Sequence, residues 1–398
     1  MANNRSQWSM TINTTSLYLH IPFCRTICTY CAFNTYAGMD DQITPFVTAL
    51  AQEIRWLAKH APETQVGTIY FGGGTPSLLT PEHYAELFAT LYDSFTIETD
   101  AEISLEANPN DLNHPYLTAL REVGFNRISI GMQSAQPTEL ELFHRRHDVP
   151  MVASAVKDAR AAGFDNLNLD LIFGIPNQTM DSWQETLEYA IGLGPQHFSL
   201  YGLELKGGTA LTKDVKAGLL PTPDDDLSAD MYEYASIRLP QAGLQQYEIS
   251  NWCVPGYEAR HNLQYWHNLP YAGLGPGAHG YVGGARTIVM RSPERYIQAM
   301  QTAPSKAAIF PRTPATSKII PVDSKTEMSE TIMMGLRLTQ EGIIRAVFQE
   351  RFGVDLVTMH QAAIDKFVRR GLLHVDTQRV RLTEQGRFVS NAILRELV

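Results

Sequence analysis

Three of the chain's four cysteines lie within eight residues, in the segment HIPFCRTICTYCAF. Cys24, Cys28 and Cys31 form a C-x3-C-x2-C arrangement that directly follows a short apolar run. Thiolates are the usual protein ligands of iron–sulfur clusters, and one short loop can present three of them to a single four-iron cube. Three cysteines leave one iron of such a cube without a protein ligand. That iron is then open to a small chelating molecule.

Structural zinc is the main alternative for this group of cysteines. A closed zinc site has four protein ligands, and the fourth would have to be His20 or the distant Cys253. A secreted disulfide scaffold would need more cysteines, spread more evenly. We interpret Cys253 as a small buried apolar residue.

Six β-rich segments must position this loop and whatever it binds. They cover residues 16–21, 67–72, 101–107, 127–133, 166–174 and 197–205, and they alternate with helical patterns. Each is dense in Ile, Leu, Val, Phe or Tyr, as parallel strands buried on both faces are. The repeat predicts an α/β fold with a parallel sheet, and six units indicate a partial (β/α)6 TIM-like barrel. Ligands bind at the C-terminal ends of such strands, which is where the cysteine loop lies.

Local signals predict several helix ends. Thr80 followed by Pro81 is typical of a helix start. Asp40 is expected to cap a helix over 41–60, and Gly124 and Gly163 to end two others.

Polar residues recur where the predicted strands end. Glu106, Gln133 and Asp170 occupy such positions on three successive strands. Buried ionisable groups must be paired or bound to a ligand, so three together favour one shared ligand. Arg145 could pair with a carboxylate through its planar fork, or be an ordinary surface charge.

The pattern changes near residue 321, which divides a core of residues 1–320 from a C-terminal domain of residues 321–398. Helical segments are expected at 325–339, 341–352, 355–370 and 383–397, with an alternating hairpin-like stretch before the last. This order predicts a small α+β, winged-helix-like domain. The chain's net charge of −10 makes nucleic-acid binding an unfavourable interpretation, so a lid or docking surface is expected.

No stretch of 18 uninterrupted apolar residues occurs, and the opening residues lack the apolar core of a signal peptide. We therefore expect a cytoplasmic protein. Residues 206–320 are less regular, and we interpret 303–320 as a linker or a crossing strand.

The cysteine spacing after the first strand resembles that of the radical S-adenosylmethionine (SAM) superfamily. In that family the amino and carboxylate groups of SAM chelate the open iron, and an electron from the reduced cluster cleaves the sulfonium. The resemblance implies a [4Fe–4S] cluster on the three cysteines and SAM as cofactor. It implies SAM contacts from Tyr18, Tyr30, Gly74, Thr75, Pro76, Glu106, Gln133, Arg145, Asp170, Gly202 and His279. In this interpretation Tyr30 packs on the adenine, and the run FGGGTPS bonds the methionine amino group.

Further stretches are similar to the oxygen-independent coproporphyrinogen III oxidase family and to its HemW-like haem chaperone branch. They include YFGGGTPSLL, SLEANP, RISIGMQS, NLDLIFGIPNQT and GLGPGAHG. The oxidase carries another cysteine where this chain has Phe33, and it has a longer arm than the 23 residues before Cys24. The run HNLQYW matches the H-N-x-x-Y-W signature of the chaperone branch.

The chaperone resemblance implies haem as cargo and haem-requiring apoproteins, respiratory ones among them, as recipients. It implies that His261 binds the haem iron and that Tyr265 and Trp266 stack on the macrocycle. A polar pocket histidine with two core aromatic residues is the alternative for this run. Coproporphyrinogen III oxidase is the alternative function, and a homodimer is compatible with either.

Overall fold

The computed structural model describes residues 14–61, 64–302 and 310–398, and its centre is a curved mixed sheet. The strand order is β14-β13-β12-β11-β1-β4-β5-β6-β7-β8-β10-β9. The opening segment, which we searched for a targeting signal, lies almost entirely outside the described residues. None of the helices in the described ranges is long and apolar enough to cross a membrane.

All six predicted strands are present and adjacent. They are β1 (Thr14–Ile21), β4 (Gln65–Gly73), β5 (Thr96–Ala107), β6 (Arg127–Gln133), β7 (Leu167–Phe173) and β8 (His197–Gly202). Each pairs in parallel with the next along the chain. The predicted partial barrel is therefore confirmed, and within the described residues no pairing joins β14 to β9 to close it.

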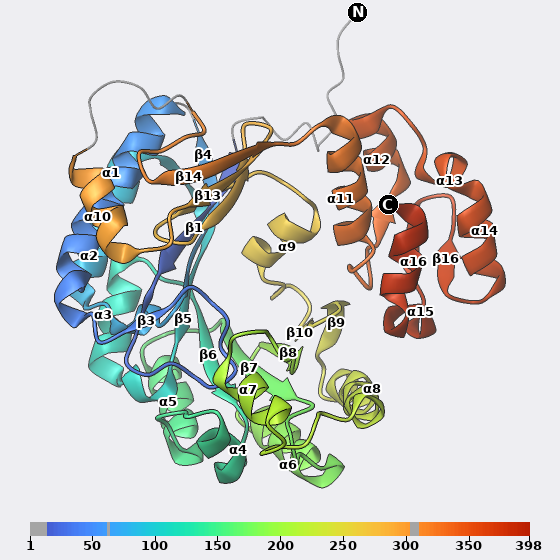
Figure 1. Ribbon diagram of the computed structural model, residues 1–398, viewed down its shortest axis with the longest axis horizontal. Coiled ribbons are helices and arrows are strands. Elements are labelled where there is room, and N and C mark those ends of the chain that lie inside the picture. Colours follow the sequence, from blue (N-terminus) through green and yellow to red (C-terminus); the bar gives the residue numbers. More distant parts are fainter. Residues whose placement is uncertain (1–13, 62–63, 303–309) are drawn as a thin grey trace, which may run out of the picture.

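Amphipathic helices cover the outer face of this sheet (Figure 1). They include α1 (Ile43–His60), α2 (Pro81–Ser94), α3 (His114–Val123), α4 (Pro137–Leu142), α5 (Val149–Ala161), α6 (Met180–Gly192) and α8 (Asp225–Gln241). Their apolar sides bury large residues such as Phe46, Phe88 and Trp183 against the strands. Because the helices take up the outer face, ligands have access only to the inner face.

The predicted helix ends are confirmed at three of four sites. The side chain of Thr80 accepts a hydrogen bond from the backbone of His83 at the start of α2. Gly124 and Gly163 end helices with φ of 127° and 86°, which glycine adopts without strain. The prediction that Asp40 caps α1 is wrong, because α1 begins at Ile43. The Asp40 carboxylate instead forms an ion pair with Arg25 at 2.9 Å.

The less regular region extends the sheet at both edges. Strands β9 (Gln245–Glu248) and β10 (Asn251–Cys253) add to β8, and β11 (Tyr271–Leu274) adds to β1. Strands β12 (His279–Val282), β13 (Ala285–Val289) and β14 (Thr316–Pro321) follow in antiparallel order. The sequence predicted a linker or a crossing strand over residues 303–320. Residues 303–309 lie outside the described residues, and the end of this segment forms strand β14.

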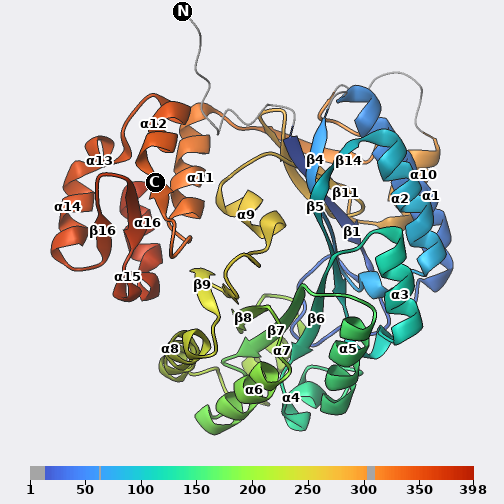
Figure 2. The same cartoon turned by 180° about the vertical axis from the view of Figure 1, so that it is seen from behind.

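Helix α9 (Arg260–Trp266) differs from the others because it lies inside the curve of the sheet (Figure 2). It carries the HNLQYW run. Helix α10 (Pro293–Gln301), by contrast, packs beside α1 on the outer face.

The C-terminal residues form an α+β unit with a hydrophobic cluster of its own. Its elements are α11 (Ser324–Gly335), β15 (Ile343–Ile344), α12 (Arg345–Phe352), α13 (Leu356–Met359), α14 (Gln361–Arg369), β16 (Leu373–Val375), β17 (Arg379–Leu382), α15 (Glu384–Phe388) and α16 (Ser390–Leu397). The order β15-β17-β16 gives the expected small antiparallel sheet. The helices predicted over 355–370 and 383–397 are each broken, at His360 and Val389, where the backbone leaves helical geometry.

Candidate functional site

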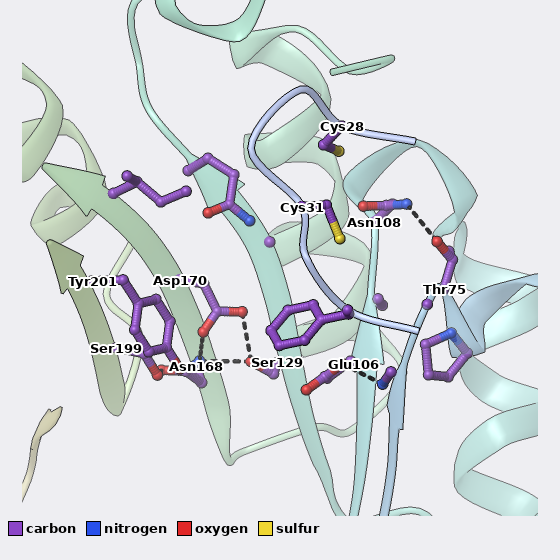
Figure 3. Close-up of a pocket in the computed structure, with 18 of the residues that line it drawn as sticks. Cys28, Cys31, Thr75, Glu106, Asn108, Ser129, Asn168, Asp170, Ser199 and Tyr201 are labelled. Carbon is purple, nitrogen blue, oxygen red and sulfur yellow. Dashed lines mark hydrogen bonds between the residues drawn. The ribbon is translucent and has the colours of Figure 1, made fainter. Parts of the chain in front are cut away.

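A cavity of about 550 Å³ lies on the inner face of the barrel. The cysteine loop lines one part of it, the strands β4 to β8 line its floor, and α9 lines another part. Figure 3 shows the loop with Cys28 and Cys31 facing the polar side chains of these strands. The cysteines and the predicted strand-end residues therefore share one chamber.

The cysteine loop is fixed to the barrel at Thr29. Its backbone N–H donates to the Phe143 carbonyl at 3.3 Å, and its hydroxyl donates to the Leu142 carbonyl at 2.8 Å. The Thr29 carbonyl accepts from Leu211 on α7 (Ala210–Lys216) at 2.9 Å. Between these anchors, the Cys31 N–H donates to the Cys28 carbonyl in a tight turn. The positions of the thiols are thus set by contacts to two distant helices.

Side chains of the cavity wall donate hydrogen bonds to the cysteine sulfurs. The Thr75 hydroxyl donates to Cys24 Sγ at 3.4 Å, and the Arg145 guanidinium donates to Cys28 Sγ at 3.5 Å. Burial raises the pKa of Cys24 to about 11 and also raises that of Cys31. These thiols therefore need a bound cation to become thiolates at neutral pH.

In the described residues the three sulfurs do not form a ready-made site for one metal ion. In the part of the chain that the structure describes, no three His, Cys, Asp or Glu side chains group closely enough to hold one metal ion. Thiolates on one zinc stand within about 4 Å of each other, because each Zn–S bond is about 2.3 Å long. On a four-iron cube each thiolate binds a different iron, so the sulfurs lie farther apart.

The proposed fourth zinc ligands are also engaged elsewhere. His20 Nδ1 lies 2.9 Å from the Tyr18 hydroxyl, and its Nε2 lies 2.9 Å from the Asn34 carbonyl. Cys253 is buried on β10 and is not part of the cavity wall. Neither of these two residues is therefore placed to be a fourth zinc ligand.

Glycines let the end of β4 pass against the cysteine loop. Gly73 has φ of 115°, and the Gly74 N–H donates to the Ile21 carbonyl at 2.7 Å. A Cβ at Gly74 would lie 2.6 Å from the Phe23 carbonyl oxygen, closer than atoms pack. Glycine at this position is a steric requirement, as the FGGG run predicts.

Two half-buried carboxylates lie on the cavity floor. Glu106 accepts from the Tyr70 hydroxyl at 2.7 Å and from the Gly73 N–H at 3.1 Å. Asp170 accepts from Ser129 at 2.9 Å and from Asn168 at 2.8 Å, as Figure 3 shows. Burial raises the pKa of both carboxyls, that of Glu106 to about 7. Neither carboxylate forms an ion pair with a cation of the described chain.

The guanidinium of Arg145 lines the cavity. The alternative interpretation of Arg145 as an ordinary surface charge is therefore wrong. Besides Cys28, its guanidinium donates to Asn108 Oδ1 at 2.6 Å and to the Gly131 carbonyl at 2.8 Å. Gln133 ends β6 in the left-handed region, with φ of 67°, and also lines the cavity. A non-glycine residue with this backbone carries strain that is common at binding sites.

The structure brings together most of the predicted site residues. Those that line the cavity are Cys24, Cys28, Cys31, Tyr18, Tyr30, Gly74, Thr75, Pro76, Glu106, Gln133, Arg145, Asp170, Gly202, His261 and Tyr265. Two do not. His279 is exposed at the start of β12, two strands beyond β1. Successive residues of an α-helix point about 100° apart around its axis, so Trp266 points to a different side of α9 from Tyr265. The Trp266 ring lies beneath the guanidinium of Arg337 and not in the cavity.

His261 lines the cavity, but both of its ring nitrogens have partners. Nδ1 lies 2.7 Å from the Thr68 hydroxyl and Nε2 lies 2.7 Å from the Tyr265 hydroxyl. Burial, followed by the charge of Arg127, lowers the pKa of His261 to about 3, so the imidazole is neutral. Nε2 is open to a metal only after Tyr265 moves away.

Sequence reasoning missed several cavity residues that lie in the strands or directly after one of them. They include Tyr70, Asn108, Arg127, Ser129, Asn168, His197, Ser199 and Tyr201. Polar residues at every second position of a predicted strand could have revealed some of them. Arg127 and Ser129 alternate on β6, as Asn168 and Asp170 do on β7, and alternate residues share one face of a strand.

Comparison with known proteins agrees with this geometry. The model of the radical SAM superfamily matches residues 18–190, and that of the HemN C-terminal domain matches residues 322–389. The chain is similar to the heme chaperone HemW of Mycobacterium tuberculosis strain H37Rv, with 37% identity over 388 residues, 96% of this chain and 94% of that protein. Identity to HemW of Bacillus subtilis strain 168 is 34%, covering 95% and 97%.

A solved structure shows the same fold. Coproporphyrinogen III oxidase (HemN) of Escherichia coli superposes with a TM-score of 0.82 at 23% identity, covering 96% of this chain and 89% of that chain. The match includes both the barrel and the C-terminal unit. The chain belongs to the radical SAM superfamily and, within the coproporphyrinogen III oxidase family, to the HemW-like branch.

Proposed function

We propose that the chain is a haem chaperone, which binds haem and passes it to haem-requiring apoproteins, and that it holds a [4Fe–4S] cluster and SAM in the cavity. The observation that carries this proposal is that the cysteine loop and α9 line one chamber, in a chain whose full-length relatives are named heme chaperones. A cluster on three cysteines supplies an electron and an open iron that the amino and carboxylate groups of SAM can chelate.

The cavity wall offers suitable partners for SAM. Arg145 places positive charge beside the cysteine loop, where a ligand carboxylate would lie. Glu106 and Asp170 offer carboxylate oxygens to amino and hydroxyl groups farther along the floor. Tyr30, whose ring packs edge-on against Phe143 at 4.5 Å, offers a rigid aromatic surface for the adenine.

Helix α9 supplies the proposed contact to haem. Its Tyr265 side chain and the neutral imidazole of His261 face the same chamber. Iron binding by His261 requires the Tyr265 hydroxyl to leave Nε2, so we propose that haem enters with a shift of Tyr265. Trp266 lies outside the chamber, and we do not include it in the haem site.

Phe33 supports chaperone function over oxidation of coproporphyrinogen. It stands where the oxidase has an additional cysteine, and its side chain is 72% exposed at the rim of the cavity. Although the chain shares its fold with the oxidase, it has no thiol at this position.

Two assays on cluster-loaded protein test the proposal. Anaerobic titration with haem should give a Soret band that saturates at one haem per chain. Incubation with coproporphyrinogen III, SAM and a reductant should give no protoporphyrinogen IX. The absence of a saturable Soret change, or turnover of the porphyrinogen, would contradict the proposed function.

A further inference from the structure

Arg127 is a buried cation without a partner in the described chain. It is the first residue of β6, it is 2% exposed, and it lines the cavity. Its Nε is buried and makes no hydrogen bond. No side-chain hydrogen bond or ion pair joins its guanidinium to any residue in the described ranges, unlike Arg145 at the other end of the same cavity.

The neighbouring carboxylates do not neutralise it. Arg127 lowers the pKa of both Glu106 and Asp170, so its charge reaches them. Glu106, however, bonds to Tyr70 and Gly73, and Asp170 bonds to Ser129 and Asn168. A buried charge is expensive unless it is paired, so this position is costly until an anion arrives.

Arg127 also lies far from the cysteine loop. It begins β6, whereas Gln133 ends the same strand near Arg145. Six residues of extended strand span about 20 Å. Arg145 is therefore better placed than Arg127 to meet a carboxylate chelated at the cysteine end, and Arg127 is left to a second anionic group.

We propose that Arg127 binds a carboxylate of a second ligand, which lies deeper in the barrel than SAM. This inference rests on the proposed function, because haem combines an apolar macrocycle with propionate carboxylates. The same chamber offers the Arg127 guanidinium for a propionate and, as proposed above, the His261 imidazole for the iron. The substrate class is thus a carboxylate-bearing tetrapyrrole.

The test compares haem with haem dimethyl ester, in which both carboxylates are masked, by Soret titration of the cluster-loaded protein. The wild type should bind haem about 10- to 100-fold more tightly than the ester. Arg127→Met should lower haem affinity by a similar factor and leave ester affinity within about twofold, while Arg127→Lys should retain part of the preference. Arg295→Met, an exposed residue on α10, is the matched control.

Two further readouts separate the outcomes. A melting temperature of ligand-free Arg127→Met close to that of the wild type would show that the variant folds; if the variant does not fold, the wild-type preference for haem over the ester still decides. SAM affinity, measured by calorimetry, should be unchanged in Arg127→Met. A loss of SAM affinity would assign Arg127 to the SAM carboxylate and overturn the inference.

Equal affinity of the wild type for haem and ester, or an equal loss of both in Arg127→Met, would also overturn it while leaving haem binding intact. Failure of the wild type to bind haem at all would instead contradict the proposed function, and with it this inference.

Discussion

The guanidinium of Arg145 lies 3.5 Å from Cys28 Sγ, although the two residues are 117 positions apart in the chain. The same guanidinium bonds to Asn108 at the end of β5 and to the Gly131 carbonyl on β6. Arg145 therefore links the cysteine loop to the ends of two central strands. Its positive charge therefore lies directly beside the cysteine loop.

Arg145→Met should weaken SAM binding about 10-fold or more, because a charged hydrogen bond to a carboxylate contributes roughly 1.5–3 kcal/mol. Calorimetric titration of the cluster-loaded protein measures this. Arg146→Met is the matched control, since Arg146 pairs with Asp111 at 2.9 Å away from the cysteines. An equal effect of the two variants would remove Arg145 from the SAM site.

Cys28→Ser should abolish the broad visible absorbance that forms on anaerobic reconstitution with iron and sulfide. Serine is a poor ligand for iron–sulfur clusters, and two thiolates do not retain the cube. Cys253→Ser, on β10 and outside the cavity wall, should reconstitute like the wild type. Unchanged iron content in Cys28→Ser would refute the assignment of the loop.

Glu106 should make stability depend on pH between about 4.5 and 7. Its pKa in the folded chain is raised by burial to about 7, so the folded state binds a proton that the unfolded state has lost. The contribution of Glu106 is therefore fully present below pH 4.5 and is lost as pH rises to about 7, by up to about 3 kcal/mol. Denaturant titrations should show a smaller fall in the free energy of unfolding across this range for Glu106→Gln than for the wild type. Identical pH profiles would show that this carboxyl is not perturbed.

His261 and Tyr265 should have opposite effects on haem binding. His261→Ala should weaken haem binding and change the Soret position, because it removes the proposed iron ligand. Tyr265→Phe should preserve or strengthen binding, because it frees Nε2, which the hydroxyl now contacts at 2.7 Å. A normal titration of His261→Ala would exclude this histidine as the ligand and leave it as a structural residue bonded to Thr68.

The sequence predicted those parts of the fold that depend on residues close together in the chain. Dense apolar runs marked the six parallel strands, and the cysteine spacing and the FGGG run marked the loop and the close approach at Gly74. Glu106 and Asp170 were predictable because the ends of parallel strands meet at one edge of a sheet.

The rest depends on contacts between distant residues. The capping role of Asp40 was lost to an ion pair with Arg25, which no helix pattern reveals. The HNLQYW run does not show that α9 enters the barrel, so the outward position of Trp266 was not predictable. Arg127 resembles any strand-initiating arginine until the topology places it in the cavity wall, where its buried Nε has no hydrogen-bond partner.

The central claim is that three thiolates hold a four-iron cluster with one iron open to SAM. The most direct measurement is iron and sulfide analysis of the anaerobically reconstituted wild type, with electron paramagnetic resonance of the reduced protein before and after SAM is added. We expect about four irons and four sulfides per chain and a spectrum that changes when SAM binds. Bound zinc in place of iron, or a cluster spectrum that SAM leaves unaltered, would contradict it.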